Sequence, residues 1–162
     1  MSKLLVKFPS RNRPEKFRNI LDDYTSRTSG KHDVRFVITM DFDDETMNND
    51  EIKNYLESLK SNGIDLVYHY GNSKTKVEAC NANLDGESAD VILLISDDMA
   101  LQQDNYDDII LSDFAKYLPD YDGGIKYHDG LRDDVLMTLP VIGWKFYEKY
   151  GDIYNPEYTS VY

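Results

Sequence analysis

The chain has 162 residues, enough for one domain with a substantial core and too few for two full ones. Its 18 Lys and Arg against 30 Asp and Glu give a net charge of -12, which argues against sequence-independent binding to nucleic acid or anionic membranes. The longest apolar run, residues 91–95, is far shorter than the roughly 20 residues of a membrane span. The single cysteine, Cys80, excludes an internal disulfide and favours a reducing cytoplasm.

The first hundred residues alternate between strand and helix patterns. Strands are predicted at residues 4–8, 34–40, 64–70 and 91–95. Helices are predicted to begin at Pro14, at Asn49 or Asp50, and after Gly71. Such alternation predicts βαβ units and a mostly parallel sheet of the α/β class.

The pattern after residue 98 is less regular. It predicts a helix at residues 105–117, strands at 123–128 and 136–142, and a helix at 144–150. The tail contains turn residues and several tyrosines. Tyr147, Tyr150, Tyr154, Tyr158 and Tyr162 can form a stacking surface for a sugar, cover the sheet, or pair with a second copy in a homo-oligomer.

Polar side chains follow three of the predicted strands. They occupy residues 10–13, 41–44 and 96–98. Ligands of open α/β sheets bind beyond the carboxyl ends of the strands, so we expect these three segments to be neighbours in space. The charge distribution agrees, because residues 1–40 carry a net +5 and residues 85–134 a net -11. This division suits a phosphate-bearing ligand bound with a metal cation, although most of the carboxylates are expected to be ordinary surface.

Asp97 and Asp98 directly follow a buried strand, and two adjacent carboxylates repel each other unless a cation or proton lies between them. Their hard oxygen atoms favour Mg²⁺ or Mn²⁺. The alternative, equally compatible with the dipeptide alone, is that one of them caps a turn. Neither a phosphate-binding P-loop motif nor the glycine-rich dinucleotide fingerprint is present.

Four segments in this order resemble family 2-type glycosyltransferases, which have the GT-A fold. They are residues 9–14, 41–46, 76–81 and 89–99, and the resemblance covers nearly the whole chain. It implies a three-layer α/β/α sandwich with a mostly parallel, Rossmann-like sheet. It also implies one domain, 1–162, with a nucleotide-sugar-binding half at residues 1–100 and an incomplete acceptor half at residues 101–162.

The resemblance further implies roles for individual residues. Pro9, Ser10 and Arg11 would hold the nucleoside of a nucleotide-diphospho-sugar, and Asp41 would accept a hydrogen bond from the base, most often uracil. The donor would then be a UDP-sugar. The phosphates would meet three basic residues: Arg11, Arg13 and Lys76.

Asp98, together with Asp97, would bind the Mn²⁺ or Mg²⁺ ion that bridges the diphosphate. The chain departs from the family pattern at two positions. The D-x-D motif is here Ser96-Asp97-Asp98, and Cys80 stands where many relatives have an arginine. We expect Cys80 to be a small packed helix residue rather than a nucleophile.

The family's catalytic base lies in an acidic motif that would follow soon after residue 154, and the sequence ends at Tyr162. The chain is therefore expected to be a truncated or natural fragment, or a member with its base elsewhere. The nearby substitutes are Asp129, Asp133 and Asp134, which are otherwise solvated loop carboxylates. Among the histidines, His128 is the candidate nearest to this loop.

Three functions are compatible with these observations. The first is metal-dependent transfer of a sugar from a nucleotide-diphospho-sugar to an acceptor hydroxyl, with a carbohydrate as one acceptor class. The second is a catalytically incomplete remnant that only binds the donor. The third is a nucleotidyltransferase, which should have a glycine-rich loop after the first strand, where this chain has Ser10-Arg11-Asn12-Arg13.

Overall fold

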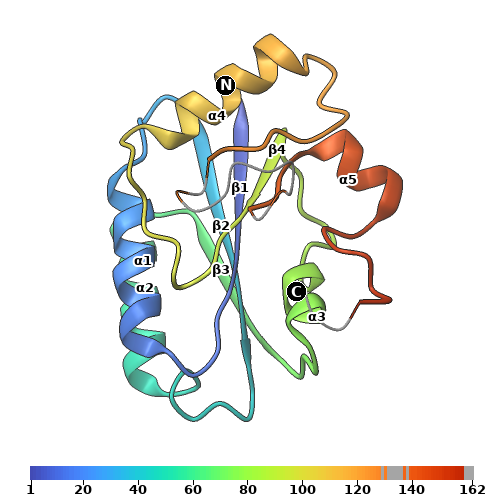
Figure 1. The fold of residues 1–162 in the computed structure, drawn as a ribbon. Helices are drawn as coiled ribbons and strands as arrows, with labels where there is room; N and C mark the ends of the chain where they lie inside the picture. The colour runs from blue at the N-terminus through green and yellow to red at the C-terminus, as the bar shows by residue number, and fades with distance from the viewer. Residues whose placement is uncertain (129, 131–136, 138, 159–162) are drawn as a thin grey trace.

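A computed structural model describes residues 1–128, 130, 137 and 139–158, and Figure 1 shows its five strands and five helices. The elements in chain order are β1 (Lys3–Pro9), α1 (Pro14–Ser26), β2 (Asp33–Asp41), α2 (Asp50–Ser61), β3 (Leu66–Gly71), α3 (Lys76–Asn81), β4 (Val91–Leu94), α4 (Tyr106–Tyr117), β5 (Val141–Gly143) and α5 (Trp144–Tyr150).

The strands form one sheet in the order β3-β2-β1-β4-β5. β1 to β4 are parallel, and β5 pairs antiparallel with β4. The predicted mostly parallel α/β sheet is therefore confirmed. β1 lies at the centre, so the loop after it lies between the exits of β2 and β4, as the placement argument requires.

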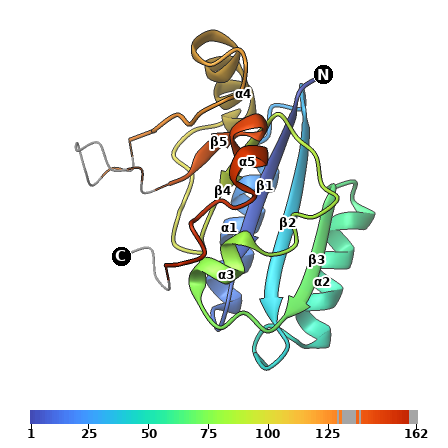
Figure 2. The same ribbon diagram turned by 90° about the vertical axis from the view of Figure 1, so that its right-hand side faces the viewer.

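Helices cover both faces of the sheet, which gives the three layers that the sequence predicts. Figure 2 shows α3 and α5 in front of the strands, with α1 and α2 behind them. Alternate residues of β1 point to the two sides. Leu4, Val6 and Phe8 pack in the larger cluster with α1, α2 and α4, and Leu5 packs in the smaller cluster with Tyr147 of α5.

Local sequence signals account for the helix starts. Pro14 occupies the first turn of α1, where its missing N–H costs nothing. Asn49 caps α2, because its side-chain oxygen accepts from the Ile52 N–H at 3.0 Å. Thr75 caps α3 by accepting from the Glu78 N–H at 3.1 Å. These caps fix the points at which the chain leaves the strand ends and re-enters a helix.

The prediction of a strand at residues 123–128 is wrong, since this segment makes only an isolated bridge between Gly124 and Ile142. The backbone of Tyr121 lies directly against Gly143. Residues 123–125 lie beside β5, because the Ile125 N–H donates to the Val141 carbonyl at 3.0 Å and the Gly143 N–H donates to the Gly123 carbonyl at 2.8 Å. The strand predicted at residues 136–142 is observed only as Val141–Gly143, and most of its first half lies outside the described residues.

Candidate functional site

The exits of β1 and β4 meet through Asp97. Its carboxylate is buried and accepts from the Ser10 hydroxyl at 3.1 Å and from the Arg13 guanidinium at 3.0 Å. Ser10 is itself buried, whereas about half of the Arg13 side chain is exposed. The structure therefore brings together three of the residues that the sequence singles out, from segments more than 80 positions apart.

The exits of β1 and β2 meet through Arg11. Its guanidinium donates to Asp41 at 2.8 Å and to Asp43 at 2.7 Å. Asp41 also accepts from the backbone N–H of Ser73 at 3.1 Å, a contact for which the sequence contains no local signal. Hydrogen bonds from Arg11 lower the pKa of Asp43 below its usual value. This pairing neutralises Arg11 and orients Asp41 from both sides.

The loop after β1 is held in place by Asp44, which is buried. The carboxylate accepts from the backbone N–H of Asn12 at 2.6 Å and from the Thr46 hydroxyl at 2.6 Å. Asn12 has a positive φ of 60°, a conformation that Asn tolerates better than most residues. Asp44 thus has the turn-stabilising role that is the ordinary alternative for acidic loops.

Asp98 differs from its neighbour Asp97 because it is exposed. A hydrogen bond from the Ser96 hydroxyl is the main cause that lowers its pKa, with smaller contributions from the charges of Lys76 and Arg13. Lys76 begins α3, and Pro9 ends β1. All the predicted donor-site residues therefore lie at or beside one edge of the sheet.

The two carboxylates after β4 are not part of a ready metal cluster. Within the described part of the chain, no group of three or more His, Cys, Asp or Glu side chains is placed to hold a metal ion. Mg²⁺ in proteins often binds through only one or two carboxylates and completes its shell with phosphate oxygens and water. The donor set of Asp97 and Asp98 fits that mode of binding.

A buried polar group lies beneath the site. Lys7 of β1 is fully buried, and its ammonium donates to the Thr39 hydroxyl, which donates to the Asn83 side chain at 2.8 Å. Burial lowers the pKa of Lys7 to about 7. In the sequence, Lys7 has no signal beyond its place in an otherwise apolar strand. Cys80 is buried as predicted, and burial raises the pKa of its thiol to about 11.

Three of the residues predicted for the acceptor side are not among those that the structure describes, namely Asp129, Asp133 and Asp134. His128 is exposed, and its Nδ1 accepts from the Gly130 N–H at 2.9 Å. Of the tail tyrosines, Tyr147 is buried against the sheet as one prediction has it, whereas Tyr150 is 67% exposed. Tyr162 lies outside the described residues, and the predicted stacking of a sugar and pairing with a second copy stay predictions.

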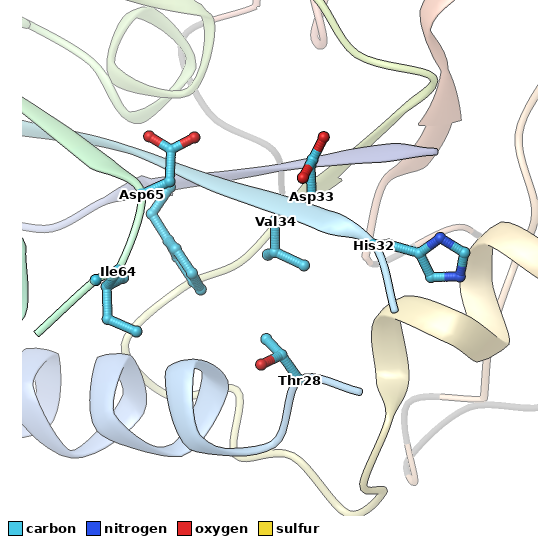
Figure 3. A pocket seen from close by; sticks show the side chains of 8 residues that line it. Thr28, His32, Asp33, Val34, Ile64 and Asp65 are labelled. Carbon is cyan, nitrogen blue, oxygen red and sulfur yellow. The ribbon is translucent and has the colours of Figure 1, made fainter. Parts of the chain in front are cut away.

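Figure 3 shows a cavity of about 240 Å³ beside the amino-terminal ends of β2 and β3. Thr28, Val34 and Ile64 point into it, whereas the carboxylates of Asp33 and Asp65 point away. Because the predicted site lies at the carboxyl ends of the strands and contributes no lining residue, this cavity is not the expected donor site.

Several solved structures resemble the chain, including the following three. A mannosyltransferase from Pyrobaculum calidifontis, in complex with GDP-Man and Mn²⁺, matches with a TM-score of 0.65 at 13% identity over 93% of this chain and 47% of its own. S. aureus TarS in complex with UDP-GlcNAc matches with a TM-score of 0.53 at 16% identity over 75% of this chain and 32% of its own. A cytidylyltransferase from Leptospira borgpetersenii matches with a TM-score of 0.52 at 13% identity over 93% of this chain and 63% of its own.

The chain has the fold of GT-A glycosyltransferases. It spans less than two thirds of the length of each of the three structures. No protein-family model and no curated protein sequence matches it. Among residues 1–128, 130, 137 and 139–158, no helix is long and apolar enough to cross a bilayer.

Proposed function

We propose that the chain is the donor-binding part of a glycosyltransferase that moves a sugar from a nucleotide-diphospho-sugar to an acceptor hydroxyl. The carrying observation is the meeting of the β1, β2 and β4 exits, through Arg11 with Asp41 and through Ser10 and Arg13 with Asp97. This is the edge at which α/β sheets bind ligands. The fold shared with nucleotide-sugar transferases supports the proposal.

The nucleoside would bind at the turn Pro9-Ser10-Arg11, with Asp41 facing the base. A carboxylate has about four acceptor positions, and Arg11 and Ser73 use two of them on Asp41. Capacity therefore remains for the N–H of a pyrimidine or purine base. The fixed orientation of Asp41 would select a base that presents a donor, which uracil and guanine both do.

The diphosphate would lie near Arg13 and Lys76. Both side chains are exposed cations, and the charges of both act on Asp98. Because Arg13 already neutralises Asp97, it would have to release that carboxylate and turn toward the phosphates when the donor binds. Such an exchange of partners keeps each charge compensated.

Asp97 and Asp98 would hold Mn²⁺ or Mg²⁺, which supplies neutralisation of the charge that develops on the departing diphosphate. The acceptor hydroxyl needs a base, for which Asp129, Asp133 and Asp134 stay predictions. A chain without a working base would bind the donor and transfer nothing. The proposed setting is the cytoplasm, with the acceptor class unspecified beyond a hydroxyl such as that of a carbohydrate.

A nucleotidyltransferase is the second candidate, because a cytidylyltransferase shares the fold and matches over 63% of its own length. The loop after β1 argues against it. Residues 10–13 contain two arginines and no glycine, so the backbone cannot approach a triphosphate as closely as a glycine-rich loop does. The same titration that tests the first proposal includes CTP and separates the two.

The test is calorimetric titration of UDP, GDP and CTP in the presence of Mn²⁺ and, separately, of EDTA. We expect metal-dependent binding of UDP or GDP to the wild-type chain. Asp98→Ala should weaken it by about tenfold or more, equivalent to about 1.4 kcal/mol. Asp120→Ala removes an exposed acidic side chain elsewhere on the domain and should leave binding unchanged.

Each outcome has a defined meaning. Absence of metal-dependent binding of both UDP and GDP contradicts the proposal. Binding of CTP in preference to both diphosphates favours the nucleotidyltransferase. Diphosphate binding without sugar transfer or donor hydrolysis identifies a donor-binding remnant.

A further inference from the structure

A second cavity, of about 360 Å³, is formed by α5 and the turn that follows it. It shares no residue with the cluster at the strand ends. Its lining consists of Phe146, Tyr150, Asp152, Ile153, Asn155 and Pro156. Pockets for small molecules typically combine an apolar wall with a few polar groups, and this lining has both.

The apolar wall is an aromatic pair on α5, of which Phe146 is partly buried and Tyr150 is exposed. Phe146 and Tyr150 are four positions apart, and their ring centroids lie 4.9 Å from each other at 53°. Tyr147 belongs to the smaller core cluster, and both Trp144 and Phe146 pack against it while partly buried. Because these three rings already serve packing, the 67% exposure of Tyr150 leaves an aromatic surface that the core does not require.

Two polar side chains also line the cavity. The carboxylate of Asp152 has no hydrogen bond or ion pair with any described residue. The side-chain oxygen of Asn155 accepts from the Glu157 N–H at 3.0 Å, which leaves its amide group to donate. The cavity therefore offers one strong acceptor and one donor beside the aromatic rings.

The turn that carries these polar side chains is fixed to α3 by Asn81. The side-chain oxygen of Asn81 accepts from the N–H groups of Ile153 and Tyr154, each at 3.0 Å. Its amide donates to the Tyr154 carbonyl at 2.7 Å. Three hydrogen bonds thus hold the turn in one position, so little ordering is needed when a ligand enters.

We propose that this cavity binds a pyranose ring of a saccharide. One face of a pyranose presents C–H groups that pack on the electron-rich face of an aromatic ring, and its hydroxyl rim both donates and accepts hydrogen bonds. Tyr150 and Phe146 supply the aromatic wall, Asp152 accepts from hydroxyls, and Asn155 donates to them. The negative charge of Asp152 disfavours a phosphate or a nucleotide in the same place.

The saccharide site goes beyond the proposed function, because it requires neither the donor nor the metal. If the domain is a glycosyltransferase, a sugar held here belongs to a glycan that extends past the strand-end cluster. The place of this sugar in a longer glycan rests on the proposed function, whereas binding of the ring itself does not.

The test records amide resonances of ¹⁵N-labelled chain during titration with the methyl glycosides of glucose, mannose and N-acetylglucosamine. Sorbitol, an acyclic polyol, is the control ligand. We expect at least one glycoside to shift amides within residues 146–156, with a Kd of about 1–10 mM, typical of ligands of this size. Tyr150→Ala should weaken binding about fivefold or more, and Tyr117→Ala, which removes an exposed tyrosine of α4, should not.

The assignment is overturned if none of the three glycosides shifts these amide resonances, or if sorbitol shifts them as much as the glycosides do. It is also overturned if Tyr117→Ala weakens glycoside binding as much as Tyr150→Ala does. Shifts in the same residues that depend on protein concentration without sugar indicate that a second copy covers Tyr150, and they overturn it too. UDP and GDP binding to Tyr150→Ala should match the wild type. Failure of the saccharide site and failure of the donor site are therefore read from separate titrations.

Discussion

Lys7 offers a sharp test of the interior of the sheet. It lies in the central strand, is fully buried, and donates to Thr39, a neutral hydroxyl. Burial in this setting lowers the pKa of Lys7 from 10.5 to about 7. Replacing it with methionine, an unbranched apolar side chain of similar length, removes the ionisable group while keeping most of the packing.

The direction in which stability changes with pH follows from the number of protons that Lys7 binds in the folded and unfolded chains. Between pH 7 and pH 10.5 the unfolded chain binds a proton at Lys7 that the folded chain does not, so the free energy of unfolding rises with pH across that window. Below pH 7 both states are protonated, and the full cost of the buried charge is present. At about 1.4 kcal/mol for each pKa unit, the full effect is at most roughly 5 kcal/mol, of which about 3 kcal/mol falls between pH 6 and pH 9.

The assay is urea denaturation of the wild type and Lys7→Met between pH 6 and pH 9. The variant should be the more stable protein at pH 6, and its advantage should shrink by about 3 kcal/mol by pH 9. Lys16→Met, which replaces an exposed lysine of α1, should show no such trend. His69 and Cys80, whose charges interact with that of Lys7, are present in both chains and largely cancel in the comparison.

An advantage of Lys7→Met that stays constant within about 0.5 kcal/mol over this pH range would refute the reasoning. It would mean that the ammonium is solvated or paired in the folded chain. Loss of folding in the variant at every pH would also count against it, because the interior would then need the amine itself.

Two further substitutions test contacts near the amino-terminal ends of the parallel strands, away from the candidate site. Gly143→Ala should cost about 3 kcal/mol in urea denaturation, because its Cβ would lie 2.0 Å from the Tyr121 carbonyl oxygen, whereas Gly71→Ala meets nothing within 4 Å and should cost far less. Arg35→Met removes paired hydrogen bonds of 2.7 and 2.9 Å to the largely buried carboxylate of Glu87. It should cost about 1–2 kcal/mol in the same measurement, and a loss below about 0.5 kcal/mol would place this pair among ordinary surface pairs.

The positions of the strands of the first hundred residues and of most helices can be predicted from local patterns in the sequence. Residues 91–95 form a continuous apolar run because β4 is covered on both faces, and Asn49 marks the start of α2 through its cap. The parallel pairing of β1 with β2 and of β2 with β3 agrees with the rules for βαβ units, whereas the place of β4 beside β1 is found only in the structure. The meeting of three polar segments at one edge is a consequence of this strand arrangement.

The side-chain ion pairs between neighbouring strand ends could not be predicted from the sequence, because they depend on strand register and side-chain rotamers. Nothing local in the sequence assigns Arg13 to Asp97 or Arg11 to Asp41. A similar limit explains the strand wrongly predicted at residues 123–128, because local β propensity does not show how few residues of this segment pair with β5, where the structure has one bridge between Gly124 and Ile142. The burial of Lys7 could not be predicted from the sequence either, because a lysine in a strand pattern is usually at the surface.

The structure shows which partners the unevenly distributed charges of the chain have. Several basic residues of the positive first segment pair with acidic residues far along the chain, as Arg35 does with Glu87 and Lys31 with Asp108. Much of the +5 charge of residues 1–40 is therefore paired with carboxylates of the same domain and is not available to a ligand. Arg11 is the decisive case, because two carboxylates hold it at 2.8 and 2.7 Å. Its predicted phosphate contact would require both to be broken, so the phosphate role falls more readily to Arg13, which has a single carboxylate to release, and to Lys76.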